Sequence, residues 1–229
     1  PELDCANPQQ ALAALKGADL VVAMTPFKTR ALDYAHVILP VAPFTEPSGT
    51  FINTEGRVQS FNAVVKPLGE TRPAWKVLRV LGNLLGLPGF DQDSSEAVRA
   101  GVLGGKPASV AERLNNPADG IAISLASPAP VLQRIADVPI HFADPLARRA
   151  PSLQKTRDAA PPAARMNAAT LAKLGLAAGA QVKVSLGGTA ILSAQLAAGV
   201  PDGCVRVAAG HELTSGLGPM QGELTVERA

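Results

Sequence analysis

The spacing of apolar residues in the first quarter of the chain predicts alternating helices and buried strands. Residues 8–16 have helical spacing, with Asn7 as the expected N-cap. Residues 19–24 and 36–39 are short continuous apolar runs, which are typical of parallel strands buried on both faces. A short helix is expected between them at residues 28–34. This order predicts a parallel α/β sheet.

Two parallel strands do not make a stable sheet, because a parallel sheet needs several neighbouring strands and cover on both faces. We therefore expect this region to be a remnant of a larger doubly wound sheet. Its first strand should have an edge that is incompletely paired.

Residues 44–61, FTEPSGTFINTEGRVQSF, have the pattern of a β-hairpin. Asn53 opens a tight loop, and Gly56 is expected in the left-handed conformation that closes a three-residue hairpin loop with a bulge. That loop sets Ile52 opposite Val58 and so keeps an apolar pair on one face.

A predicted amphipathic helix follows at residues 73–85, with one apolar stripe, and Gly86 ends it. Residues 91–139 then alternate short helical patterns with Gly and Pro breaks. One of these patterns is 129–135. The region is interpreted as a helical connector with no chemistry of its own.

The pattern changes to short strands from about residue 140. Gly187-Gly188 joins two of them as a hairpin, and the alternation of apolar residues predicts a small β-barrel. The predicted strands are residues 181–186, 189–196, 204–209 and 223–228. The chain is thus expected to divide into an α/β segment (1–90), the connector (91–139) and the barrel (140–229).

Composition adds limits to this picture. The chain has 229 residues, 47% hydrophobic and 17% charged, which indicates a globular protein with a core of aliphatic residues. A net charge of +2 gives no support for nucleic-acid binding. Residues 141–165 are locally basic, which we interpret as a solvated face or a surface for an acidic partner. No run reaches 18 apolar residues, so no membrane insertion is expected.

Candidate chemistry is sparse. Cys5 and Cys204 lie far apart, which excludes an iron–sulfur or zinc site built within this chain alone. His36 is expected to pack in its strand, and His211 to serve a turn. Glu55, with Glu46, is one of two carboxylates in a rigid setting. Asn53 and Arg57 have side chains that can hydrogen-bond a ligand, although turn formation already explains Asn53.

The hairpin region resembles the molybdopterin oxidoreductases of the dimethyl sulfoxide reductase type. The resemblance is carried by AHVILP at residues 35–40, by Glu46, by GTF at 49–51, and by Asn53 and EGRVQ at 55–59. It implies family cofactor-binding positions that are vestigial in this chain. They are Gly49, Asn53, Glu55, Gly56 and Arg57.

Within that superfamily, residues 144–150, 152–156, 209–211 and 217–220 are similar to the family of the largest soluble subunit of bacterial NADH:quinone oxidoreductase, respiratory complex I. We call it the large complex I subunit. The resemblance implies a C-terminal region with a double-psi-type β-barrel and a scaffold role in electron transfer from NADH to quinone.

This resemblance also implies what the chain should hold and contact. No catalytic residue, metal or cofactor is expected here, and iron–sulfur clusters are expected upstream. The implied partners are other complex I subunits and the N-terminal region of the same subunit, on the cytoplasmic side of the bacterial inner membrane.

Two alternatives stay open. The chain is also compatible with the C-terminal half of a true molybdopterin enzyme, such as a formate dehydrogenase. Gly49, Asn53, Arg57 and the head of the barrel helix would then contact the pterin dinucleotide. The third interpretation is a stand-alone β-barrel interaction domain.

Overall fold

The computed structural model describes residues 1–115, 117–122 and 130–229 and forms two compact units. The first, here called the barrel unit, comprises Pro1–Ala18 and Ser124–Ala229. The second, here called the α/β unit, comprises Asp19–Ile123. The units therefore divide the chain differently from the three segments expected at 1–90, 91–139 and 140–229. None of the helices in the described residues is both long enough and apolar enough to cross a membrane.

Helix α1 (Pro8–Lys16) has the predicted bounds, and it belongs to the barrel unit. The Asn7 side chain caps it by accepting a hydrogen bond from the backbone N–H of Gln10. The Gln9 side chain donates to the Ser215 carbonyl at 2.8 Å. Met220 N–H donates to the carbonyl of Ala6 at 3.0 Å. These contacts tie the start of the chain to a loop near its end.

The α/β unit begins with the expected parallel strands. β1 (Val22–Thr25) and β2 (Val37–Pro40) pair in parallel, with Val22 opposite Val37. Within the described residues β1 pairs with β2 alone, so its other edge is free, as predicted. Between the strands the chain forms a single 3₁₀ turn, η1 (Arg30–Asp33), in place of the predicted helix.

The hairpin forms in the predicted register. β3 (Gly49–Ile52) and β4 (Val58–Phe61) are antiparallel, with Ile52 opposite Val58 and Phe51 opposite Gln59. Gly56 has φ +80°, as the loop requires. The Phe51 and Phe61 rings stack on one face at 4.9 Å between centroids.

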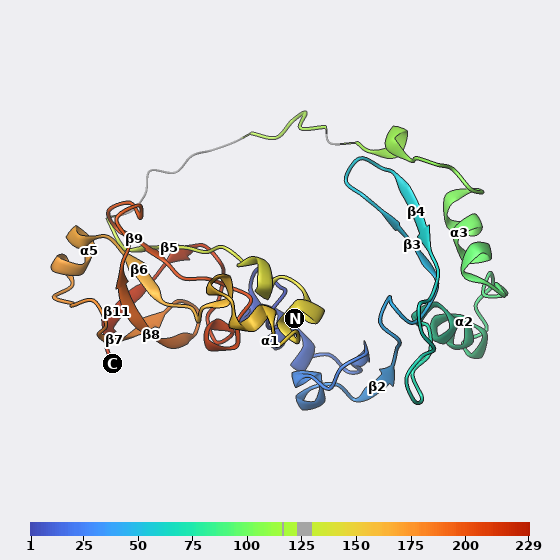
Figure 1. Cartoon of the computed structure of the whole chain (residues 1–229), viewed down its shortest axis with the longest axis horizontal. Coiled ribbons are helices and arrows are strands. Elements are labelled where there is room, and N and C mark those ends of the chain that lie inside the picture. The colour runs from blue at the N-terminus through green and yellow to red at the C-terminus, as the bar shows by residue number, and fades with distance from the viewer. Residues whose placement is uncertain (116, 123–129) are drawn as a thin grey trace. The chain divides into compact units, whose positions relative to one another are not determined.

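Two helices follow the hairpin, α2 (Ala74–Leu84) and α3 (Ser95–Leu103), and then the 3₁₀ turn η2 (Ala111–Arg113). Helix α3 contacts β3 (Figure 1). The apolar stripe predicted on α2 is present but uncovered, because Leu78, Leu81 and Leu84 are all exposed. Leu84 is 80% exposed.

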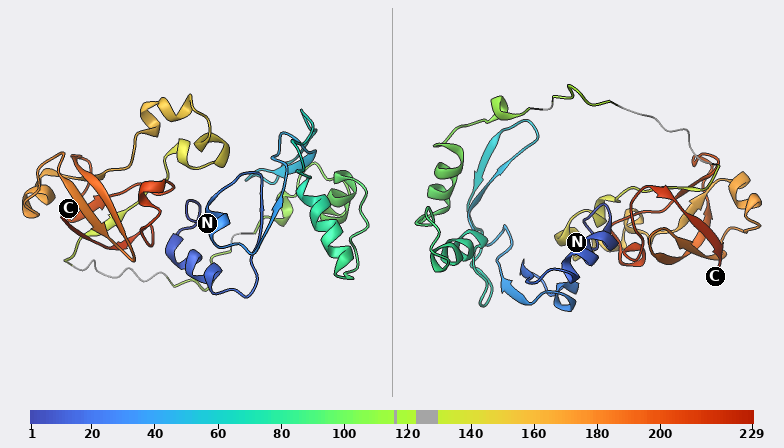
Figure 2. Two further views of the ribbon diagram at one scale, coloured as in Figure 1. Left: turned by 90° about the horizontal axis from the view of Figure 1, so that it is seen from below. Right: turned by 180° about the vertical axis from the view of Figure 1, so that it is seen from behind.

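The barrel unit is built on a seven-stranded, barrel-like sheet in the order β10-β5-β9-β6-β8-β7-β11 (Figure 1, Figure 2). The predicted strands 181–186, 189–196 and 204–209 are present, the last one shorter, and 223–228 is interrupted. The strands are β5 (Gln133–Ile135), β6 (Ala164–Met166), β7 (Gln181–Ser185), β8 (Thr189–Leu196), β9 (Cys204–Arg206), β10 (Gly222–Glu223) and β11 (Thr225–Arg228).

Strands β5 and β6 are differences from the sequence prediction. The helical pattern expected at 129–135 is wrong for its described part, because Gln133–Ile135 pairs in parallel with β9. Residue 129 lies outside the described residues. β6 pairs in parallel with β8 and antiparallel with β9 at one position, Arg165 opposite Arg206. A three-residue strand is too short for its apolar period to be recognised.

The core of the barrel unit is made of aliphatic side chains, as the low aromatic content predicts. Val182 and Val184 on β7 point inward, and the residue between them is exposed. The core residues with no solvent exposure are Ala164, Met166, Val182, Val184, Ala194, Val205, Val207 and Leu217.

Short helical segments connect the strands of this unit. They are η3 (Ile140–Phe142), α4 (Pro145–Arg148), η4 (Leu153–Lys155), η5 (Arg157–Ala159), α5 (Ala168–Lys173) and η6 (Glu212–Thr214). Asn167 caps α5 through its side-chain oxygen, which accepts from Thr170 N–H at 2.8 Å. The Asn167 amide also donates to Asp202 at 2.5 Å.

Candidate functional site

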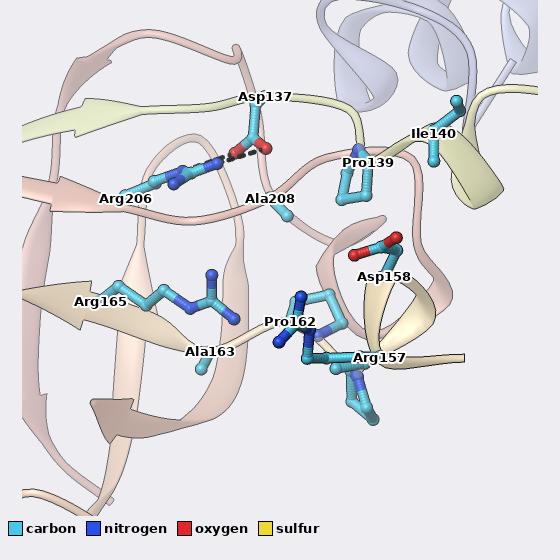
Figure 3. Close-up of a pocket in the computed structure, with 12 residues that line it drawn as sticks. Asp137, Pro139, Ile140, Arg157, Asp158, Pro162, Ala163, Arg165, Arg206 and Ala208 are labelled. Atoms are coloured by element: carbon cyan, nitrogen blue, oxygen red, sulfur yellow. Dashed lines mark hydrogen bonds and ion pairs between the residues drawn. The ribbon is translucent and has the colours of Figure 1, made fainter. Parts of the chain in front are cut away.

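The barrel unit carries a pocket of about 410 Å³ that three arginines and two aspartates line (Figure 3). We call it the arginine pocket. Its polar residues come from the loop after β5, from η5, from β6 and from β9. The remaining wall is aliphatic. The lining residues are Asp137, Pro139, Ile140, Arg157, Asp158, Ala160, Pro161, Pro162, Ala163, Arg165, Arg206 and Ala208.

Arg206 and Asp137 form a two-pronged ion pair at one side of this pocket. Arg206 Nε donates to Asp137 Oδ1 at 2.9 Å, and its Nη2 donates to Oδ2 at 2.8 Å. These hydrogen bonds, with a smaller Coulombic contribution from Arg165, hold the pKa of Asp137 below its usual value. The same contact raises the pKa of Arg206. Both groups are therefore charged at neutral pH.

Arg165 lies beside this pair with no counter-ion of its own. It sits directly opposite Arg206 across β6 and β9. Within the described residues it forms no ion pair or hydrogen bond, and Figure 3 shows its guanidinium extending into the pocket. Arg157 likewise lines the pocket without an ion-pair partner in the described part of the chain. Two of the three guanidinium groups are thus available to a ligand.

The hairpin residues singled out in the sequence are instead used within the α/β unit. Asn53 Oδ1 accepts from Arg57 N–H at 2.8 Å and from Glu55 N–H at 3.1 Å, so it organises the turn. The Arg57 guanidinium is exposed and lies 4.0 Å from the Glu55 carboxylate. None of the five predicted positions lines the arginine pocket.

The two hairpin glycines are explained by close packing. A Cβ on Gly56 would lie 2.7 Å from the backbone nitrogen of Ala111, and a Cβ on Gly49 would lie 2.7 Å from the Phe61 ring. Gly49 also lines a largely apolar groove of about 290 Å³, with Trp75 and Val98 among its walls. Whether these positions bind a cofactor stays a prediction.

The other candidate side chains serve the fold. The His36 Nδ1 accepts from Val21 N–H at 3.0 Å, and the side chain is exposed rather than packed as predicted. His211 has the predicted turn role, because its Nδ1 accepts from Leu213 N–H at the start of η6. Glu46 accepts from the backbone N–H of Leu68 at 3.1 Å. Within the described residues, no group of three His, Cys, Asp or Glu side chains is arranged to hold a metal ion.

One buried charged residue was missed completely by the sequence analysis. Arg134 is 3% exposed, and its Nη1 and Nη2 atoms donate to the carbonyls of Pro219 at 2.8 Å and Val207 at 3.4 Å. Burial lowers the pKa of Arg134 to about 10. Its position inside a pattern interpreted as helical gave no sign of this role. The locally basic stretch 141–165 was, by contrast, a signal for Arg157 and Arg165.

Comparisons with known proteins agree with the hairpin resemblance at the level of the superfamily. Residues 1–84 match the family model of the molybdopterin oxidoreductases, described as "Molybdopterin oxidoreductase". A "Putative formate dehydrogenase" of Staphylococcus aureus (strain bovine RF122 / ET3-1) is 42% identical over 74 residues, which is 32% of this chain and 8% of that protein. A "Putative formate dehydrogenase" of strain USA300 is 40% identical over the same shares.

Among solved structures, acetylene hydratase from Pelobacter acetylenicus aligns with 97% of this chain and 42% of its own, with a TM-score of 0.69 and 18% identity. This likeness establishes a shared fold. The match to the curated relatives spans 8% of their length. Residues 1–84 thus carry a molybdopterin oxidoreductase segment, and nothing in these matches is specific to NADH:quinone oxidoreductase.

Proposed function

We propose that the chain is the C-terminal region of an oxidoreductase of the molybdopterin type, in the class of the formate dehydrogenases. One observation carries this proposal: the chain joins the family match over residues 1–84 to a fold that aligns with acetylene hydratase over 97% of its length. The relatives named as putative formate dehydrogenases favour that class over the other members of the superfamily.

The uncovered apolar surface of the α/β unit supports the view that this region is part of a larger structure. β1 and β2 form a two-stranded sheet with Val22 and Val37 exposed, and the α2 stripe is also exposed. Monomeric proteins rarely leave such extended apolar faces in contact with water. We propose that other parts of the polypeptide cover them and carry the catalytic centre.

A pterin-held molybdenum centre would supply the redox chemistry, and this chain would hold and orient it. The residues proposed for this are Gly49, Asn53 and Arg57, with the head of α5. Their fit is partial, since the Asn53 side-chain oxygen already accepts two backbone hydrogen bonds in its own turn. The exposed Arg57 guanidinium keeps free donors and is the best candidate of the three.

A second candidate is the scaffold region of the large complex I subunit, with a double-psi-type barrel. The observation that favours it is the use of Asn53, Glu55 and Gly56 by the hairpin itself, which explains these residues without a ligand. The chain would then hold no cofactor, with iron–sulfur clusters upstream. Its partners would be the other subunits of the peripheral arm, on the cytoplasmic side of the membrane.

Metal analysis of the complete parent protein, purified from its own host, separates the two candidates. The formate dehydrogenase class predicts bound molybdenum or tungsten and formate-dependent reduction of a viologen dye. The scaffold candidate predicts neither, and instead co-purification with an NADH-oxidising, quinone-reducing complex. A complete protein with NADH:quinone activity and no molybdenum would overturn the first proposal, and one with molybdenum and formate activity would overturn the second.

A further inference from the structure

The arginine pocket contains a charge arrangement that the fold alone does not balance. Arg165 and Arg206 are directly opposite each other across antiparallel strands, a placement in which like charges repel. Asp137 answers Arg206 alone, because both of its carboxylate oxygens accept from that guanidinium. Arg165 is half-buried and has no carboxylate partner among the described residues.

The full set of charges in the pocket also favours an anion. Arg157, Arg165 and Arg206 contribute three positive charges, against the negative charges of Asp137 and Asp158. One net positive charge is left, on the side of the pocket away from the ion pair. A guanidinium presents paired N–H donors that match the oxygens of a carboxylate or phosphate.

The remaining walls indicate the size of the ligand. The pocket volume of about 410 Å³ is within the range of small-molecule sites and exceeds what one inorganic anion fills. Pro139, Pro161 and Pro162 are rigid and offer an aliphatic surface to an organic body. We propose that the arginine pocket binds a small organic anion, with its phosphate or carboxylate group on Arg165 and Arg157 and its body against the prolines.

The site is separate from the proposed cofactor positions on the hairpin, because none of the five hairpin residues lines it. It also does not depend on which parent enzyme is correct. Asp158 lies at the same pocket and would repel a second anionic group near it, so the site favours one anionic group per ligand.

Titration of the full 229-residue chain tests this proposal at low ionic strength, where charge contacts are least screened. The probes are phenyl phosphate, benzoate and inorganic phosphate, followed through the NMR signals of the arginine Nε–H groups. We expect saturable shifts at Arg165 and tighter binding of phenyl phosphate than of inorganic phosphate, because only the former has an organic body. The comparison of phenyl phosphate with benzoate identifies the preferred anionic group.

Three variants make the test specific. Arg165→Gln is expected to weaken binding about 10-fold or more, since it removes a charge-assisted hydrogen bond. Arg228→Gln, on exposed β11 outside the pocket, is the matched control and is expected to change affinity less than about 2-fold. Asp137→Asn is expected to strengthen binding, because it removes a competing anion and releases Arg206.

The opposite sign expected for Asp137→Asn guards against a general loss of folding. Equal affinities in the wild-type, Arg165→Gln and Asp137→Asn chains would overturn the proposal. Absence of any Arg165 shift at probe concentrations of about 10 mM would also overturn it, because that is weaker than any useful affinity.

Discussion

The two units of this chain differ in how completely each one buries its own apolar residues. The barrel unit encloses eight core residues that have no solvent exposure at all. The α/β unit has comparable apolar patterning, but its helix α2 and its strands β1 and β2 keep apolar side chains exposed. The same kind of sequence pattern therefore produces a core in one unit and an open surface in the other. The difference is whether the covering elements are present in these 229 residues.

The largest effect is expected from a matched pair of leucines. Leu217→Ala removes a fully buried side chain in the barrel unit and should cost about 2–5 kcal/mol of its unfolding free energy. Leu84→Ala, in α2, should cost less than about 0.5 kcal/mol, because Leu84 is 80% exposed. Native-state hydrogen exchange measures both units separately. Similar costs at the two positions would show that the α/β unit has a core of its own.

A pair of glycines tests the packing inside the α/β unit. Gly56→Val combines a left-handed φ of +80° with a Cβ only 2.7 Å from Ala111, and should cost about 2–4 kcal/mol. Gly69→Val is the control, since Gly69 is also left-handed, at φ +58°, but has no atom within 4 Å of its Cβ position. Its cost should be smaller, about 1–2 kcal/mol from backbone strain alone. Amide exchange in the α/β unit measures both costs, and equal values would show that the packing at Ala111 is unimportant.

A pH-dependent difference is expected in the barrel unit. Burial lowers the pKa of His211, with partial opposition from Glu212. The unfolded chain then binds a proton more readily than the folded one, so stability is complete above about pH 6.5 and falls as the pH drops below it. The half-exposed position limits this loss to less than about 1 kcal/mol.

His211→Asn keeps an acceptor for Leu213 N–H and cannot titrate, so it should flatten this slope. Denaturant unfolding at about pH 7.5 and about pH 5.5, on either side of the usual histidine pKa, gives the comparison. A barrel unit with the same slope in both proteins would show that His211 is not responsible.

The smallest effect is expected at the hairpin tip. Glu55→Gln removes an exposed ion pair with Arg57 at 4.0 Å and should change stability by less than about 0.5 kcal/mol. In the complete parent enzyme it should also leave electron transfer nearly unchanged. A large loss of activity in a normally assembled enzyme would assign Glu55 a role at the cofactor and contradict the structural explanation of this loop.

The sequence was sufficient where one local rule decides the structure. The bounds of α1, the parallel pair β1 and β2, and the hairpin register all follow from caps, apolar runs and turn residues. It was insufficient where distant segments decide. β5 is a strand because β9 and β10 pair with it, and Arg134 is buried because carbonyls far along the chain accept its hydrogen bonds. The arginine pocket is likewise assembled from four separated segments, which local patterns do not bring together.

The membership of α1 in the barrel unit has a consequence for how the protein is made. Gln9 and its acceptor Ser215 are 206 positions apart, so α1 leaves the ribosome long before the segment it packs against. At a synthesis rate of about 5–20 residues per second, that interval is on the order of 10–40 s. During this time a nine-residue helix is too short to be stable alone. The first helix of the chain is thus among the last elements to acquire its native contacts, and the α/β unit is synthesised entirely within that delay.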